Sequence, residues 1–172
     1  LFTLQITPDS ISKAVNENYI KIVENLLSVN ADFLKKNNFK FIFRQHPRFS
    51  PDHCPSVNLE YDFISFDNLT PMPDLIDDVC MHITFNSTSV FEASMIGLPT
   101  IFIDMHDQEF PKEINSNKVF SNDVYLKDYK YPYKDLFIKS YKDLENILVK
   151  LNDKTIYDDW CKNIYEWSKD LY

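Results

Sequence analysis

The amino-acid sequence predicts an α/β protein of the Rossmann-like class, built on a doubly wound parallel sheet. Short apolar runs alternate with longer runs of helical periodicity along the 172 residues, a pattern typical of strands joined by crossover helices. One strand–helix–strand unit is especially clear at residues 80–104. Because 44% of the residues are hydrophobic, the chain can bury one core, and we expect a single domain over residues 1–172.

In the first part of the chain we expect three strands and one long helix. Apolar side chains recur at helical spacing over residues 11–37, which predicts a helix with a break at 28–31. Proline and aspartate at the start of residues 71–78 predict a short helix there. The three apolar runs of strand length lie at residues 1–5, 39–43 and 57–61.

The unit at residues 80–104 is the one around which the chain is expected to be organised. Residues 80–85 are predicted as a strand, and a helical run follows the polar cluster at residues 86–89. Gly97 is the only glycine in the sequence, and it stands where a helix ending at residue 96 needs a left-handed residue. Pro99 prevents the helix from continuing, so residues 100–103 are predicted as the next strand.

The last third of the chain is expected to begin irregularly and to end in helices. Residues 104–135 are predicted as an irregular segment with a short strand near 124–125, and residues 139–172 as C-terminal helices at 140–151 and 155–171. The last helix carries an apolar stripe consisting of Trp160, Ile164, Trp167 and Leu171. Such a stripe either covers the core or docks against a neighbouring domain.

Composition excludes several classes of protein. A net charge of −8 argues against a nucleic-acid partner, which would require a basic surface. The three cysteines fit neither a disulfide framework nor a zinc site, so we expect a cytoplasmic protein and no metal. No apolar run approaches the ~18 to 20 residues that a membrane span requires.

Two short segments carry the residues expected to bind a ligand. Arg44 and Arg48 are the only arginines in the sequence, and both flank His46 and Pro47 just after a predicted strand. Arginine matches the geometry of phosphate or carboxylate oxygens, and histidine donates a hydrogen bond or a proton to the same group. Because proline holds the preceding residue extended, His46 should not join a helix.

The second segment is Asn86, Ser87, Thr88 and Ser89, at the start of a predicted helix. Unpaired N–H groups and hydroxyls at such a position favour an anion. The alternative is an ordinary helix cap, since Ser89 and Glu92 also fit a capping box. Under the first interpretation, this segment and the arginine–histidine segment form the two sides of an anion clamp.

These residues resemble a known family, over residues 39–104. A strand ending in His46-Pro47, paired with Ser87-Thr88, Glu92-Ala93 and Gly97-Leu98-Pro99, resembles the carboxyl-terminal, nucleotide-binding half of bacterial GT-B glycosyltransferases. The resemblance is to the sialyltransferase and capsule or lipopolysaccharide type, whose HP and SS/ST motifs hold the nucleotide of a CMP-sugar. Many GT-B domains also carry a glycine-rich loop near the first strand. This chain has residues 7–10 there instead, which favours a monophosphate such as CMP.

The resemblance implies a metal-independent glycosyltransferase that uses a CMP-activated sugar such as CMP-sialic acid. His46 would be the catalytic residue, acting on the donor phosphate. The expected substrate-binding residues are Arg44, Pro47, Arg48, Asn86, Ser87, Thr88, Ser89 and Glu92. The partners would be the nucleotide-sugar donor, a glycan acceptor and an amino-terminal GT-B domain that supplies the catalytic base. The resemblance also implies that the full-length protein associates peripherally with the inner face of the cytoplasmic membrane.

Two other functions stay open on the sequence. One is a CDP-glycerol or CDP-ribitol phosphotransferase of the teichoic-acid type, because the segment from Gly97 to Ile101 is common to many GT-B proteins. The other is a non-catalytic α/β interaction module, in which the face with Trp160 and Trp167 binds a partner and the two polar segments are only caps.

Overall fold

The computed structural model describes residues 2–4, 10–45, 60–67, 69–71, 74–75, 78–85, 87–105 and 124–171. Six parallel strands form one sheet in the order β3-β2-β1-β4-β5-β6, which is the strand order of the Rossmann fold. The strands are β1 (Phe2–Leu4), β2 (Phe41–Gln45), β3 (Ile64–Phe66), β4 (His82–Thr84), β5 (Thr100–Ile103) and β6 (Phe137–Ile138). The main helices are α1 (Ser10–Lys36), α3 (Ser89–Met95), α6 (Asp143–Lys150) and α7 (Lys154–Lys169).

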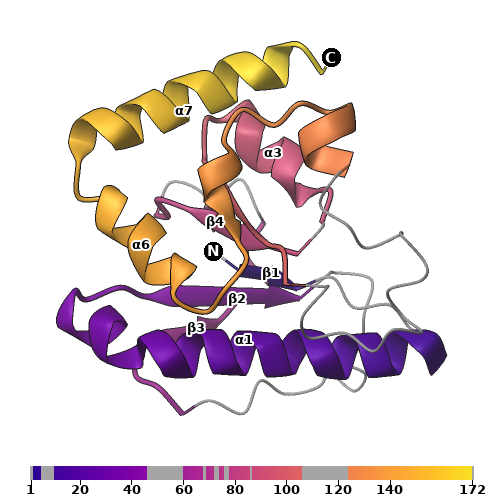
Figure 1. The fold of residues 1–172 in the computed structure, drawn as a ribbon, viewed down its shortest axis with the longest axis vertical. Helices are drawn as coiled ribbons and strands as arrows, with labels where there is room; N and C mark the ends of the chain where they lie inside the picture. Colours follow the sequence, from indigo (N-terminus) through magenta and orange to yellow (C-terminus); the bar gives the residue numbers. More distant parts are fainter. Residues whose placement is uncertain are drawn as a thin grey trace.

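Helices lie along both sides of the sheet, as Figure 1 shows, with α1 on one side and α3 and α7 on the other. The helix α6 contacts α1, and α3 packs along α7. The strand order runs from β1 to β3 in one direction across the sheet and from β4 to β6 in the other. Because crossovers between parallel strands are right-handed, the helices of these two halves lie on opposite faces of the sheet. The Rossmann-like α/β class predicted from the sequence therefore agrees with the structure.

The core lies between the sheet and these helices. All four residues of β5 and all three residues of β4 are buried, as expected for the central strands of a parallel sheet. From α1, Leu26, Leu27 and Leu34 are at most 1% exposed. The indole rings of Trp160 and Trp167 are also buried, at 2% and 8% exposure.

The end of α3 confirms the role expected of Gly97. Its φ is +74°, and its N–H donates to the Ser94 carbonyl at 2.9 Å, while the Leu98 N–H donates to the Ala93 carbonyl at 2.9 Å. These two bonds are those of the Schellman motif, whose left-handed residue is usually glycine. The turn redirects the chain into β5, which occupies the predicted residues 100–103.

Several predicted elements differ from the structure. The helix α1 runs without a break through 28–31, because buried Asn30 donates to the Leu26 carbonyl at 2.7 Å and to the Tyr141 carbonyl at 2.8 Å. Its polar group is thus satisfied inside the fold. The predicted strand near 124–125 is wrong, since a π-helical turn spans Val124–Asp128.

Two strands were placed wrongly or missed. The strand next to β2 is Ile64–Phe66 rather than 57–61; residues 57–59 lie outside the described part, and Tyr61 is not in a strand. The strand β6, which pairs with β5, was not predicted, because two residues are too few to show a period. Of the short helix expected at 71–78, residues 74–75 are helical and residue 78 is in a turn.

The C-terminal helices confirm the prediction for residues 139–172. The expected helix at 140–151 is α6, and the expected helix at 155–171 is α7. The Asp153 side chain caps α7 by accepting hydrogen bonds from the N–H groups of Thr155 and Ile156. Among the described helices, none is both long enough and apolar enough to cross a membrane.

Candidate functional site at the carboxyl edge of the sheet

The two sequence segments predicted to bind a ligand leave the sheet at the same edge. In the strand register, Thr3 of β1 pairs with Arg44 of β2 on one side and with Thr84 of β4 on the other. Arg44 and Thr84 therefore occupy the same level of the sheet, two strand spacings or about 10 Å apart. The strand order reverses between β1 and β4, and the carboxyl ends of strands at such a switch point are where open α/β sheets bind ligands.

Four of the predicted site residues lie outside the described residues. They are His46, Pro47, Arg48 and Asn86. Their roles remain predictions from the sequence. What the structure adds is the position of the strands that lead into them. His46 is two residues beyond Arg44, and Asn86 is two residues beyond Thr84.

Arg44 contacts the turn that follows β3. It is half-buried, and its Nη1 donates a hydrogen bond to the Thr70 carbonyl oxygen. In the same turn the Asp67 carboxylate accepts bonds from the Thr70 N–H at 2.9 Å and the Thr70 hydroxyl at 2.7 Å. These hydrogen bonds, with a smaller effect of the Arg44 charge, lower the pKa of Asp67 below its ordinary value. One guanidinium donor of Arg44 thus holds this turn, on the β3 side of β2.

The serine and threonine segment forms a compact turn between β4 and α3. Ser87 is buried, and its hydroxyl accepts a hydrogen bond from the Ser89 N–H at 3.3 Å. The Ser87 N–H donates to the Thr84 hydroxyl, also at 3.3 Å. Thr88 is exposed and occupies the N-cap position without a side-chain cap bond. Ser89 is therefore the first helical residue of α3 and not its N-cap, which differs from the alternative in which Ser89 and Glu92 form a capping box.

Glu92 lies in the first turn of α3 and is exposed. It stands one helical turn beyond Ser89, as expected from their spacing. The helix has only seven residues, about two turns. For this reason we assign any ligand contact here to side chains and not to the helix end itself.

A buried histidine lies beneath this turn and was not included among the predicted site residues. His82 of β4 is fully buried, and its Nε2 is 3.2 Å from the Ser89 hydroxyl. Its Nδ1 is 3.0 Å from the hydroxyl of Thr100, its register partner on β5. Burial, and to a smaller extent the charge of the chain's amino terminus, lowers the pKa of His82 to about 3. The imidazole is therefore neutral at pH 7.

The sequence contained one signal for this network. His82 and Thr84 are polar residues two apart on a short, otherwise apolar strand, so both face the same side of the sheet. A strand buried on both faces carries polar side chains at some cost unless they find partners. The complete burial of His82 shows that it is packed inside the sheet.

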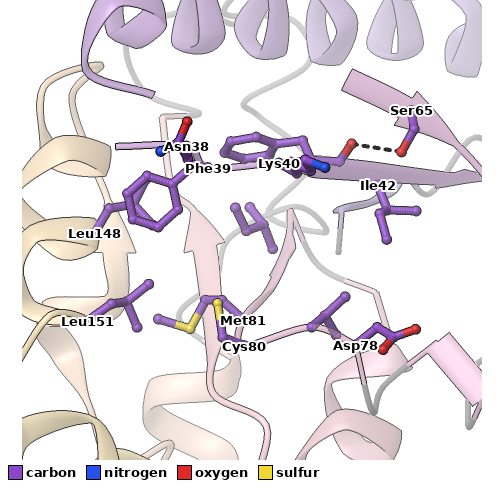
Figure 2. Close-up of a pocket in the computed structure, with 13 residues that line it drawn as sticks. Asn38, Phe39, Lys40, Ile42, Ser65, Asp78, Cys80, Met81, Leu148 and Leu151 are labelled. Atoms are coloured by element: carbon purple, nitrogen blue, oxygen red, sulfur yellow. Dashed lines mark hydrogen bonds between the residues drawn. The ribbon is translucent and has the colours of Figure 1, made fainter. Parts of the chain in front are cut away.

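A cavity of about 400 Å³ lies at the opposite edge of the sheet. Figure 2 shows Phe39 and Lys40, which precede β2, facing Cys80 and Met81, which precede β4, with Leu148 of α6 at one side. The residues that precede β2 and β4 lie at the amino ends of these strands. The cavity is thus separate from the edge where both predicted segments leave the sheet.

No cluster of three or more histidine, cysteine, aspartate or glutamate side chains suited to a metal ion occurs within the described ranges.

No protein-family model matches the chain, and the comparisons with curated proteins and with solved structures found no match. The fold and strand register alone thus define the class, an α/β protein with Rossmann-like strand order.

Proposed function

We propose that this chain is the nucleotide-sugar-binding domain of a metal-independent GT-B glycosyltransferase in the synthesis of a bacterial surface polysaccharide. The preferred donor is a CMP-activated acidic sugar such as CMP-sialic acid. In this proposal the domain works with a second domain that binds the glycan acceptor and supplies the catalytic base. The cytoplasmic location and peripheral membrane association expected from the sequence belong to the same proposal.

One observation carries the proposal. Arg44 and Thr84 lie at the same level of the sheet, on either side of β1. The His46-Pro47 and Ser87-Thr88 motifs therefore follow strand ends that flank the switch point from both sides. Two motifs that were recognised separately in the sequence thus start from opposite sides of one ligand-binding position of the fold.

The chemistry assigned to this edge is stabilisation of a departing nucleotide. As the bond between sugar and phosphate breaks, negative charge grows on the phosphate oxygens, and preorganised hydrogen-bond donors stabilise it. We assign His46 as the residue that donates a hydrogen bond or a proton to that phosphate. Arg48, Asn86, Ser87, Thr88 and Ser89 are proposed as further donors. Glu92 is proposed to contact a ribose hydroxyl of the nucleotide.

Arg44 has a more limited role in this proposal. One of its donors is used by the Thr70 carbonyl, while a guanidinium group has five N–H donors in all. The proposal assigns it an electrostatic contribution to phosphate binding and the positioning of the segment that contains His46. Pro47 is proposed to shape that segment by holding the preceding residue extended.

The experiment is a thermal-shift and calorimetric titration with CMP, CDP and UDP. At a CMP concentration of 100 times Kd, binding to the native state should stabilise the protein by about 2.7 kcal/mol. For a chain of this size, that corresponds to a rise in Tm of about 5 to 10 °C. We expect His46→Ala to abolish the shift.

The matched control is Lys40→Ala. Lys40 is exposed and precedes the same strand β2, but at the amino edge of the sheet, so its removal should leave the CMP shift intact. Absence of a shift with all three nucleotides would remove the proposal. A larger shift with CDP than with CMP would instead favour the CDP-glycerol or CDP-ribitol phosphotransferase.

The interaction-module alternative has lost the surface on which it was argued. Trp160 and Trp167 are buried within the domain, where Trp167 lies against Phe91 and Tyr131 with ring centroids 6.3 and 5.1 Å apart. The apolar stripe of α7 thus covers the domain's own core.

A further inference from the structure

The cavity at the amino edge of the sheet lies between β2 and β4. Its lining includes Phe41 and Ile42 of β2 and Met81, which precedes β4, with Leu148 of α6 at one side (Figure 2). Further along the sheet β1 separates β2 from β4, so these two strands are two strand spacings, or about 10 Å, apart. The gap between them therefore has room for the backbone of one strand.

The strand register places the cavity directly ahead of β1. Phe2, the first residue of β1, pairs with Phe43 of β2 and with Ile83 of β4. Two residues earlier along each neighbour are Phe41 and Met81, which both line the cavity. A residue that continued β1 backward to this level would stand between them, directly ahead of the first residue of the sequence.

The backbone of Ile42 faces this gap. The Phe41 N–H donates to the Phe63 carbonyl at 2.8 Å, and the Phe43 carbonyl accepts from the Asp67 N–H at 3.0 Å. Phe41 and Phe43 thus direct these groups toward the β3 side, and backbone groups alternate in direction along a strand that is paired on both sides. Ile42 therefore directs its N–H toward β1, where its partner in a parallel ladder is the carbonyl of a residue at the level of Phe41.

The side chains around the gap define which residues fit it. Side chains at one level of a parallel sheet point to the same face. Phe41 and Met81 are 5% and 4% exposed and belong to the core, so a residue between them buries its side chain. One residue earlier the neighbours are Lys40 and Cys80, which are exposed. The gap thus suits a segment with an apolar residue directly ahead of Leu1 and a polar residue before that.

We propose that the cavity receives an amino-terminal continuation of β1, supplied by the segment that joins this domain to the amino-terminal domain of the full-length protein. The inference rests on the proposed function for the existence of that segment and on the strand register for its place. A continuation of β1 already has the direction and register of the gap. A separate peptide or a second copy would have to end where β1 begins, because β1 occupies the rest of the gap. The connection is thus made at the amino edge, which leaves the carboxyl edge open to a ligand.

The test joins two residues ahead of Leu1. One chain carries Thr-Val, its matched control carries Thr-Asp, and both are compared with the chain that starts at Leu1. Each chain is released from a cleavable fusion, so that its first residue is defined. Both extensions move the charged amino group, which acts on His82, so the comparison between them isolates the side chain directly ahead of Leu1.

We expect Thr-Val to raise the Tm by about 3 to 10 °C over Thr-Asp, because one valine side chain becomes buried. Hydrogen exchange followed by NMR should show that Thr-Val slows the Ile42 N–H about tenfold more than it slows the Phe41 N–H, relative to the chain that starts at Leu1. Phe41 is the internal control because its N–H already has a partner. Equal Tm values for the two extensions, or equal changes at Ile42 and Phe41, overturn the inference.

The remaining outcomes separate this inference from its rivals and from the proposed function. If the chain that starts at Leu1 is a dimer by light scattering and its Ile42 N–H is already protected, a second copy fills the gap and the proposed occupant is overturned. If Thr-Val stabilises the protein as expected but none of CMP, CDP and UDP binds, the continuation of β1 is supported and the proposed function fails. If CMP binds but the two extensions have equal effects, the proposed function stands and this inference is overturned.

Discussion

Gly97 lies so close to Cys161 of α7 that a β-carbon at position 97 would be 3.0 Å from the Cys161 carbonyl oxygen. The contact joins the end of α3 to the middle of α7, and it is backbone against backbone. Gly97 also has a positive φ of +74°, which other residues adopt at a cost of about 1 to 2 kcal/mol. The sole glycine of the chain is therefore required for two reasons, the positive φ of its backbone and the lack of space for a β-carbon.

We predict that Gly97→Ala lowers the free energy of unfolding by about 2 kcal/mol or more, because backbone strain and the clash with Cys161 add. Urea denaturation followed by circular dichroism measures the change. Met95→Ala is the control, since Met95 lies on the same helix and is 53% exposed. Equal midpoints for the two variants would contradict the close packing of α3 on α7.

The part of the fold that was predicted well is the part with strong local signals. The residues of β5 and the end of α3 at Gly97 were both assigned from a short apolar run, a lone glycine and a following proline. At these positions the turn-forming residues, the burial of the strand and the local preference for helix or strand all favour the same structure. The same holds for α6 and α7, whose periodic apolar faces define helices.

The part that was missed depends on tertiary contacts. The strand β6 has two residues and exists because Phe137 and Ile138 pair with Phe102 and Ile103. The edge strand β3 is held by its register with β2, from Phe41↔Ile64 to Phe43↔Phe66. Local sequence contains neither pairing, so periodicity alone could not place these strands.

The candidate site was predictable as two segments but not as a network. Polar residues after strands pointed to His46 and to Ser87. The hydrogen bond between His82 and Ser89 requires the path of the turn from β4 to α3, and the one between His82 and Thr100 requires the β4–β5 register. Neither is encoded in the spacing of the residues involved.

Acid sensitivity should depend on His82. Burial depresses its pKa to about 3 in the folded protein, against about 6.5 when unfolded. Between these values the unfolded chain binds one more proton, so this stability is present above pH 6.5 and is lost as the pH falls toward 3. We predict that His82→Gln removes about 1.4 kcal/mol per pH unit from the slope of stability against pH below 6.5.

Urea midpoints of the wild type and His82→Gln between pH 7.5 and pH 4.5 measure this slope. The stability of the wild type minus that of His82→Gln should fall as the pH falls, whatever the value of this difference at neutral pH. Parallel curves would mean that the imidazole already binds its proton in the native state.

Tyr131 is predicted to stabilise the centre of the sheet through its hydroxyl. This hydroxyl accepts from the Thr100 N–H and donates to the Thr100 carbonyl, both at 2.9 Å. Tyr131→Phe leaves two buried backbone groups without this partner, so we expect a loss of about 1 to 3 kcal/mol. Denaturation of Tyr165→Phe is the comparison, because Tyr165 is 44% exposed and should change little. A neutral Tyr131→Phe would show that Thr100 finds other partners.

Alkaline conditions should unfold the protein through tyrosines that are buried or half-buried, Tyr131, Tyr133 and Tyr157. Burial raises the pKa of Tyr131 and Tyr157 well above the ordinary value of 10, and raises that of Tyr133 to about 12. Stability contributed by these groups is present below pH 10 and is lost as the pH rises above it, because the unfolded state releases their protons first. Phenolate absorbance should therefore rise in two steps, the later one coinciding with the loss of helical circular dichroism. A single step before unfolding would contradict the burial of these rings.

The last prediction concerns the apolar stripe of α7. Trp160 packs at 6.3 Å from the Tyr133 ring, and Trp167 donates from Nε1 to the Tyr129 carbonyl at 2.6 Å. We predict that Trp160→Ala costs about 3 to 5 kcal/mol of stability, as for other large aromatic residues removed from a core. Denaturation midpoints and light scattering are to be compared with those of Tyr165→Ala on the exposed face of the same helix. If Trp160→Ala changed the association state while its midpoint stayed that of the wild type, the stripe would be a docking surface and the intramolecular packing would be refuted.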